Sequence, residues 1–197
     1  MNNKRIAPYI IGGVLILLIG YVIVTYNALV KKDEKVKLQW NEVQNAYQRR
    51  IDFIPNVVNV VKGQADFEQT TLIQLTEARA KATSVNVSAG EISAEKFNQQ
   101  GQVQNELAAA ANRFMITVEK YPQLKGAEAF AGLQVQLEGT ERRIKFARKD
   151  FNVAIADFNS SVKAFPTKIV AGIFDFQPRE GFQADTGADK SIEIKFN

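Results

Sequence analysis

Residues 7–26 read APYIIGGVLILLIGYVIVTY and include no charged side chain. A helix rises about 1.5 Å per residue, so a stretch of this length covers about 30 Å, the thickness of the hydrocarbon core of a bilayer. Three tyrosines lie near its ends, where interfacial aromatic side chains are usual: Tyr9, Tyr21 and Tyr26. The stretch therefore predicts one transmembrane helix, and the rest of the chain is arranged around it.

The basic residues beside this stretch bear on cleavage and on orientation. Lys4 and Arg5 precede it, as in a secretory signal, but the stretch is longer than the about 7–15 apolar residues of a signal, and bulky Tyr26 stands at its exit. We therefore expect an uncleaved anchor. More lysines follow the stretch than precede it: Lys31, Lys32, Lys35 and Lys37. By the positive-inside rule, this excess predicts that the large domain after the anchor lies in the cytoplasm.

The composition narrows the chemistry that the chain can perform. Its 197 residues include no Cys and no His, and its net charge is +4. Without these residue types there is no disulfide, no thiolate nucleophile, no zinc site built from Cys and His, and no Ser-His-Asp triad. Any catalysis would have to use carboxylate, Lys or Tyr side chains. The mild positive charge suits a position beside anionic lipid and is thin support for nucleic-acid binding.

The first segment after the anchor has the apolar period of a helix. Apolar residues recur every three or four positions: Val36, Trp40, Val43, Tyr47, Ile51, Ile54, Val58, Val61 and Ala65. The pattern keeps its phase across Pro55, so two architectures are open. In the favoured one the chain reverses near Asp52, whose side chain caps a new helix with Pro55 in its first turn. In the alternative one long helix is kinked at Pro55, because proline removes the hydrogen bond to the Ile51 carbonyl.

Three further segments have helical patterns. They cover residues 56–83, about 92–120 and about 127–165, and the first two are separated by a loop at residues 84–90. Long amphipathic helices joined by short connections bury their apolar faces against each other. The predicted fold is therefore all-α: an N-terminal transmembrane helix followed by an antiparallel up-and-down bundle of four long helices, or of three with the first kinked at Pro55.

The chain divides by composition into four parts: a short N-terminal tail (1–6), the transmembrane anchor (7–26), the helical bundle domain (27–166) and a C-terminal tail (167–197). Within the tail, residues 169–174 are apolar enough to fold back on the bundle. Residues 178–187 are typical of a flexible connector. Residues 191–196 alternate like a strand, and we expect them to fray rather than to pair with the sheet edge of a partner.

Several short motifs stand in a specific order and spacing: YNALV at 26–30, RRIDFIPNVV at 49–58, VKG at 61–63 with Glu68, EAR at 77–79, EKYPQLK at 119–125, Phe130, Leu133, EGTE at 138–141, Ile144, Ala147, Arg148, Asn152, Asn159, Phe165 and Pro166. Together they resemble the LemA family of bacterial membrane proteins. The resemblance implies a single span in the bacterial inner membrane, a helical bundle in the cytoplasm and no established enzymatic activity. The chain has Phe151 and Phe158 where the family often has Tyr, which argues against chemistry at those positions.

The densest group of charges is a candidate binding face. Arg142, Lys145 and Lys149 share one side of a helix, and we take Arg142, Lys145, Arg148 and Lys149 together as a basic face for lipid phosphates or an acidic protein partner. A solvated face, partly neutralised by Glu138 and Glu141, is the plainer interpretation and is favoured. Nucleic acid is not expected as a partner, because no recognised binding module accompanies these cations.

Two other groups of polar residues have structural interpretations. The predicted bend carries a structural corner made of Arg49, Arg50, Asp52 and Pro55, in which a buried pair of Arg and carboxylate would hold the bend. Asn152 and Asn159 lie seven positions apart on the last helix. A half-buried Asn restricts the register of a bundle, so we expect these two to specify packing rather than to bind a ligand.

These observations favour a protein without catalytic, cofactor or metal-binding residues. The sequence has no P-loop, dinucleotide fingerprint or nucleophile elbow, and its carboxylates form no compact liganding motif. The main hypothesis is a membrane-anchored, non-enzymatic scaffold or adaptor that presents its bundle to a protein partner or organises the membrane, with homo-oligomerisation open. The alternative is a small-ligand receptor or enzyme with a cleft of carboxylate and Lys side chains between helices.

Overall fold

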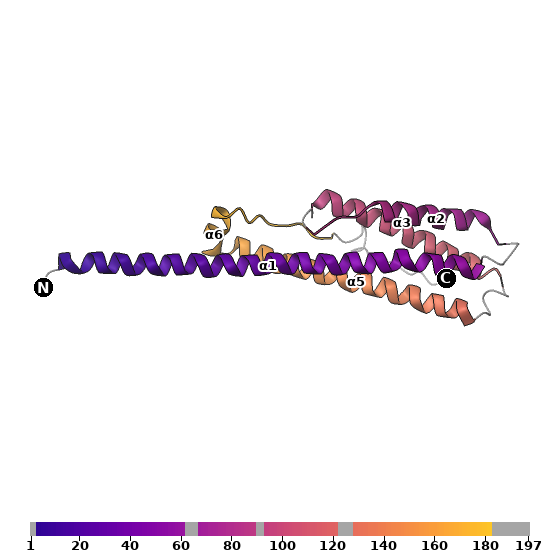
Figure 1. Ribbon diagram of the computed structural model, residues 1–197, viewed down its shortest axis with the longest axis horizontal. Helices are drawn as coiled ribbons and strands as arrows, with labels where there is room; N and C mark the ends of the chain where they lie inside the picture. Colours follow the sequence, from indigo (N-terminus) through magenta and orange to yellow (C-terminus); the bar gives the residue numbers. More distant parts are fainter. Residues whose placement is uncertain (1–2, 62–66, 90–92, 122–127, 183–197) are drawn as a thin grey trace, which may run out of the picture.

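A computed structural model describes residues 3–61, 67–89, 93–121 and 128–182, and every regular element within these ranges is a helix. The helices are α1 (Asn3–Val61), α2 (Gln69–Ser84), α3 (Ala94–Val118), α5 (Glu128–Lys163) and α6 (Thr167–Ile173). Figure 1 shows an elongated bundle from which α1 projects alone toward its N-terminus. The predicted all-α fold, with a long apolar helix followed by a bundle, is confirmed.

The four long helices run up and down in sequence order. α1 lies along α5, and α2 lies along α3 (Figure 1). Lys32 on α1 pairs with Asp157 on α5, whereas Arg50 further along α1 pairs with Glu141 earlier on α5, so these two helices are antiparallel. The connections between the long helices are short, which is the arrangement in which neighbouring helices pack antiparallel.

α1 joins the apolar stretch to the bundle without a break. It is 59 residues long, and among the described residues it is the helix that is long and apolar enough to cross a membrane, by length and composition. Its large apolar side chains are exposed toward the N-terminus, from Tyr9 to Val24, and its buried positions begin at Thr25 and Leu29. The same helix therefore has a section with apolar side chains facing outward and a section that forms one wall of the bundle.

The predicted reversal near Asp52 is wrong. α1 continues through Pro55 and ends at Val61, and the next helix begins only at Gln69. The alternative, one long helix through Pro55, is correct in that the helix continues past the proline. It is wrong in length, because α1 ends at Val61 and a separate helix follows. Continuity costs a hydrogen bond, since Pro55 has no N–H to donate to the Ile51 carbonyl. Arg79 of α2 replaces that donor: its Nε donates to the Ile51 oxygen at 3.1 Å.

The core of the bundle is divided in two along its length. A cluster at the end remote from the apolar stretch contains Ile54, Leu107 and Phe114 among others, and a second cluster nearer that stretch contains Trp40, Phe97 and Phe151 among others. Fully burying a side chain of this size stabilises the fold by about 1.5–3 kcal/mol. Most of the predicted apolar stripe positions that the structure describes are in these two clusters.

Phe165, the last apolar residue of the helical pattern predicted at about 127–165, is an exception, because its side chain is 84% exposed. α5 ends at Lys163, so the helical period no longer determines where Phe165 points. The chain then turns into α6, whose Val170 and Ala171 are buried, as expected for a segment that folds back on the bundle.

Residues 176–182 form an extended segment that returns along α5, and we call it the strap. The turn into the strap ends α6: Phe176 N donates to Ala171 O at 2.9 Å, and Asp175 between them has φ of 57°, the left-handed conformation common at helix C-termini. The predicted flexible connector at 178–187 is thus an ordered strap up to Phe182. The rest of that connector, residues 183–187, and the predicted strand at 191–196 lie outside the described residues.

Candidate functional site

The predicted basic face lies on the middle of α5. Arg142, Lys145 and Lys149 are exposed, and Arg148 is half-buried. Glu141, expected to neutralise Lys145 within the helix, reaches across the bundle to Arg50. Lys145 and Lys149 therefore present their charges outward, whereas Arg148 turns its guanidinium over the Phe182 ring of the strap, 4.3 Å from the ring centroid.

Three of the four basic residues surround one hollow of about 430 Å³ between α3, α5 and the strap. Its lining includes Lys145, Arg148 and Lys149 together with Arg50, Glu141, Asn105, Ala108, Ile144, Asn152 and Phe182. Arg142 does not line it. The hollow is therefore a mainly cationic depression on a bundle surface, with one carboxylate in its wall.

Arg50 lies under this hollow as part of a buried polar layer. Its side chain is only 3% exposed, and it donates to Glu141 Oε2 at 2.5 Å and to the Gln104 carbonyl at 2.8 Å. The layer contains Arg50, Gln104 and Glu141 and separates the two apolar clusters. Along its own helix, each of the three lies between a core residue of one cluster and a core residue of the other. A polar layer of this kind restricts the register in which helices can pack.

The layer holds more hydrogen-bonding groups than it uses. Three of its buried atoms, Arg50 Nε, Gln104 Nε2 and Glu141 Oε1, have no partner among the described residues, and neither does the buried Tyr47 Oη next to the layer. Burial lowers the pKa of the Arg50 guanidinium, while the adjacent Glu141 carboxylate opposes that shift. Burial also raises the pKa of the Tyr47 hydroxyl, which keeps it protonated.

The four residues of the predicted corner do not form a corner. Pro55 is exposed within α1, and Asp52 accepts a hydrogen bond from Gln48 one turn earlier at 2.8 Å. A buried Arg–carboxylate pair does exist, but Arg50 makes it with Glu141 of another helix rather than with Asp52. The sequence thus predicted a buried pair of Arg and carboxylate, but it did not predict that the carboxylate is Glu141.

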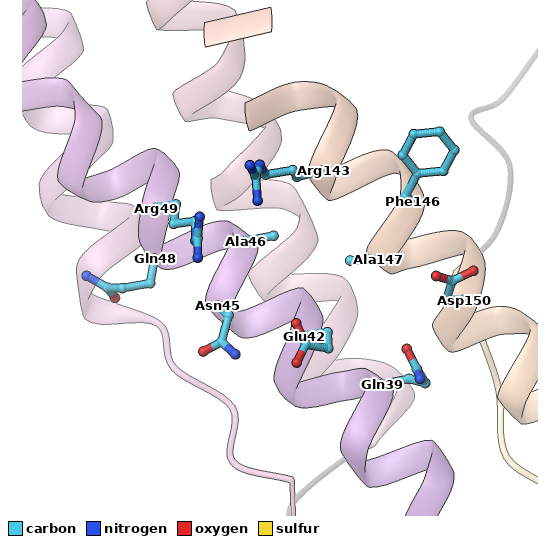
Figure 2. A pocket seen from close by; sticks show the side chains of 10 residues that line it. All are labelled: Gln39, Glu42, Asn45, Ala46, Gln48, Arg49, Arg143, Phe146, Ala147 and Asp150. Atoms are coloured by element: carbon cyan, nitrogen blue, oxygen red, sulfur yellow. The ribbon is translucent and has the colours of Figure 1, made fainter. Parts of the chain in front are cut away.

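Arg49 lies in a separate groove between α1 and α5, with a volume of about 630 Å³ (Figure 2). The side chains in this groove are segregated by charge. Figure 2 shows Arg49 and Arg143 toward one end, and Glu42 and Asp150 toward the other. The groove therefore offers an open, polar surface with a positive and a negative half.

The strap is held by the two asparagines that were expected to specify packing. Asn152 Nδ2 donates to Phe182 O at 2.9 Å and its Oδ1 accepts from Phe182 N at 2.8 Å. Asn159 makes the same pair of bonds with Arg179, at 2.7 and 2.8 Å. A spacing of seven residues places the two amides two turns apart on one side of α5, so they hold successive sites of an extended chain.

Side chains complete the attachment of the strap. The Phe182 ring lies among Trp40, Phe97 and Phe151, with ring centroids 6.1, 5.2 and 5.7 Å away, and Arg179 pairs with Asp33 at 2.7 Å. This attachment of the strap by Asn152 and Asn159 was not predicted from the sequence. The sequence feature that could have indicated it is a repeated pair, Phe151-Asn152 and Phe158-Asn159. In each pair a buried aromatic side chain precedes an amide that reaches the strap.

Comparison with known proteins places this architecture in a family. The model of the LemA family matches residues 39–196. The chain is 23% identical to magnetosome protein MamQ 2 of Paramagnetospirillum magneticum and 24% identical to magnetosome protein MamQ of Magnetospirillum gryphiswaldense, each over 90% of this chain and 72% of the relative. It is 22% identical to protein LemA of Metamycoplasma hominis over 86% of this chain and 75% of that protein. The match with the family model covers most of the chain, including the helices of the bundle and the strap, and the protein therefore belongs to the LemA family.

Proposed function

We propose that the protein is a membrane-anchored, non-enzymatic scaffold that holds a helical docking surface at a set distance from a bacterial inner membrane. The observation that carries this proposal is the continuity of α1, which runs from the exposed apolar stretch into the core of the bundle within one helix. A continuous helix transmits the position and direction of an anchor, whereas a flexible linker would not. The names of the MamQ relatives connect those proteins with magnetosomes, which agrees with a role in membrane organisation.

The distance along α1 favours a protein as the partner of the basic face. The pairing of Arg50 with Glu141 and of Lys32 with Asp157 places Lys145 level with about residue 46 of α1. At 1.5 Å per residue this level is about 30 Å beyond Tyr26. That separation is several times the Debye length of about 8 Å at physiological ionic strength. Lipid phosphates would therefore attract the basic face only weakly. An acidic surface of a cytoplasmic protein is the partner that we propose for Arg142, Lys145, Arg148 and Lys149.

The proposal is tested by photo-crosslinking in native membranes. The intact chain, carrying a photo-reactive residue at exposed Asn105 beside the basic hollow, should yield one dominant crosslinked protein. Lys145→Glu with Lys149→Glu should abolish this product, because both side chains are exposed and their reversal removes the attraction without opening the core. Arg113→Glu, which reverses one exposed cation on α3, is the control and should leave the product unchanged.

The possible results separate the hypotheses. A product that consists of a second copy of the chain would identify self-assembly as the scaffold's activity. No product from the intact chain, or a product that survives the double reversal, would contradict the basic face as the docking surface. Specific thermal stabilisation of the protein by a small metabolite would favour the alternative function, a small-ligand receptor or enzyme.

The proposed orientation has its own test. Because the sequence has no Cys, Ser88→Cys in the exposed loop between α2 and α3 introduces one label site. A cytoplasmic bundle should resist a membrane-impermeant thiol reagent in intact spheroplasts and react after lysis. Labelling in the intact spheroplasts would contradict a cytoplasmic bundle and leave the anchor itself in place.

A further inference from the structure

α6 is apolar on two opposite sides. Val170 and Ala171 face the bundle and are 2% and 1% exposed. On the other side Ile169 and Ile173, one helical turn apart, are 56% and 66% exposed, and Phe165 just before the helix is 84% exposed. An apolar face turned to water is unfavourable in a helix of a soluble domain, so this outer face calls for a partner.

The position of α6 relative to α1 indicates which partner. The Tyr26 ring contacts Phe174 and Phe176 directly after α6, with ring centroids 4.7 and 5.8 Å apart, and Tyr26 is the last residue of the apolar stretch. Figure 1 shows α6 beside α1 at the end of the bundle from which α1 projects. Exposed Ile173 and Phe174 at the end of α6 thus lie beside the last residue of the exposed apolar stretch of α1.

Basic residues next to the outer face of α6 have the positions expected at a membrane surface. Lys163 and Lys168 flank Phe165 and are exposed. Long basic side chains of this kind can lie along apolar surface and extend their ammonium groups to lipid phosphates. On α1 no charged residue lies between Arg5 and Lys31, so the section around Tyr26, which contacts the end of α6, is uncharged.

We propose that the outer face of α6, formed by Phe165, Ile169 and Ile173, inserts into the interfacial layer of the bilayer as a second membrane contact beside the anchor. This proposal rests on the proposed anchoring by α1. A second contact next to a single span restrains the tilt and rotation of the bundle, which the span alone would leave free. The ligand of this face is the lipid surface, not a second copy of the chain.

The test uses the full chain in vesicles of phosphatidylglycerol and phosphatidylethanolamine. A cysteine is introduced at one position at a time and labelled with an environment-sensitive fluorophore, which the Cys-free sequence permits. Ile169→Cys and Ile173→Cys report the outer face of α6. Ile116→Cys on α3 is a matched control, because it is an exposed isoleucine (60%) located toward the remote end of the bundle. Leu17→Cys in the apolar stretch reports the anchor.

The expected result is a blue-shifted emission at positions 169 and 173 that lipids carrying a nitroxide near the headgroup largely quench. Position 17 should be quenched more by nitroxides deep in the acyl chains, and position 116 should emit as in water. Water-like emission at 169 and 173 together with deep quenching at 17 would overturn the α6 contact and leave the anchor intact. A blue shift at 169 and 173 without quenching by lipid would also overturn it, because it would indicate a protein cover. Absence of quenching at position 17 would instead contradict the anchoring itself.

Discussion

Arg79 Nε donates a hydrogen bond to the Ile51 carbonyl, 3.1 Å away on the neighbouring helix. Ile51 is four residues before Pro55, so its carbonyl is the acceptor that the proline leaves without an intrahelical donor. A side chain of α2 thus supplies the donor that α1 lacks at Pro55, near the end of that helix at Val61, and so lowers the cost of continuing through the proline.

The first prediction concerns this replacement. Arg79→Met should lower the free energy of unfolding by about 1–2 kcal/mol, because a partly buried carbonyl loses its donor. Adding Pro55→Ala should recover much of that loss, since alanine restores the backbone N–H. Chemical denaturation of the full chain in detergent, followed by the fluorescence of buried Trp40, measures both effects. Lys81→Met on the same helix is the control and should change stability by less than about 0.5 kcal/mol; equal losses at Arg79 and Lys81 would contradict the role of Arg79.

The second prediction concerns the polar layer in the core. Glu141→Ala should destabilise the bundle by about 2–3 kcal/mol, because it leaves the buried Arg50 guanidinium without its counter-ion. Arg50→Met should cost less, since the Glu141 side chain is 39% exposed as a whole and its freed carboxylate can turn outward to water. Denaturation curves give the order of the two losses. Glu138→Ala, an exposed acid one turn away, is the control, and a larger loss for Arg50→Met than for Glu141→Ala would show that packing dominates over charge.

The third prediction concerns the strap. A Cβ added at Gly181 would lie 2.6 Å from Asn152 Oδ1, so Gly181→Ala forces that amide away from Phe182. Hydrogen exchange at the Phe182 amide should accelerate by about tenfold or more, equivalent to about 1.4 kcal/mol of lost protection. Gly132→Ala is the matched control, because an added Cβ there contacts nothing within 4 Å, and it should stabilise α5 by about 0.5–1 kcal/mol. Unchanged exchange in Gly181→Ala would mean that the strap is held elsewhere.

The fourth prediction concerns pH. The hydrogen bond from Lys32 lowers the pKa of the Asp157 carboxyl below its usual value. A lowered folded-state pKa stabilises the protein above the unfolded value of about 4, and this contribution disappears as the pH falls through the folded value. Both side chains are partly exposed, 32% for Lys32 and 44% for Asp157, so solvent screening limits the gain to about 0.5 kcal/mol.

The measurement compares Asp157→Asn with the unchanged chain. The variant should be less stable at neutral pH, and the gap should close as the pH falls through the lowered folded-state pKa of Asp157, below which the carboxyl is protonated in both states. Asp150→Asn, another exposed acid of α5, controls for the loss of one negative charge. A gap that stays constant from neutral to acidic pH would contradict the ionic contribution.

The basic face shows how far sequence reasoning reached at the candidate site. The helical spacing of Arg142, Lys145 and Lys149 correctly indicated outward-facing cations on one helix. It did not indicate that Arg50 lies buried below them, because Arg50 and Glu141 are 91 positions apart in the chain. A pairing over that separation depends on which helices meet and in which register, which local periodicity does not contain.

By itself, the sequence determined the helical fold, the exposed apolar section of α1 and most of the buried stripe positions, because these follow from the local repeat of apolar residues every three or four positions. Only the tertiary structure decided that α1 passes Pro55, that Asn152 and Asn159 hold the strap, and that Phe165 is exposed. The first two depend on groups brought together from distant parts of the chain, such as the Arg79 donor at the Ile51 carbonyl, and the third follows from the end of α5 at Lys163. Whether a local defect breaks a helix or is tolerated is a property of its neighbours in space.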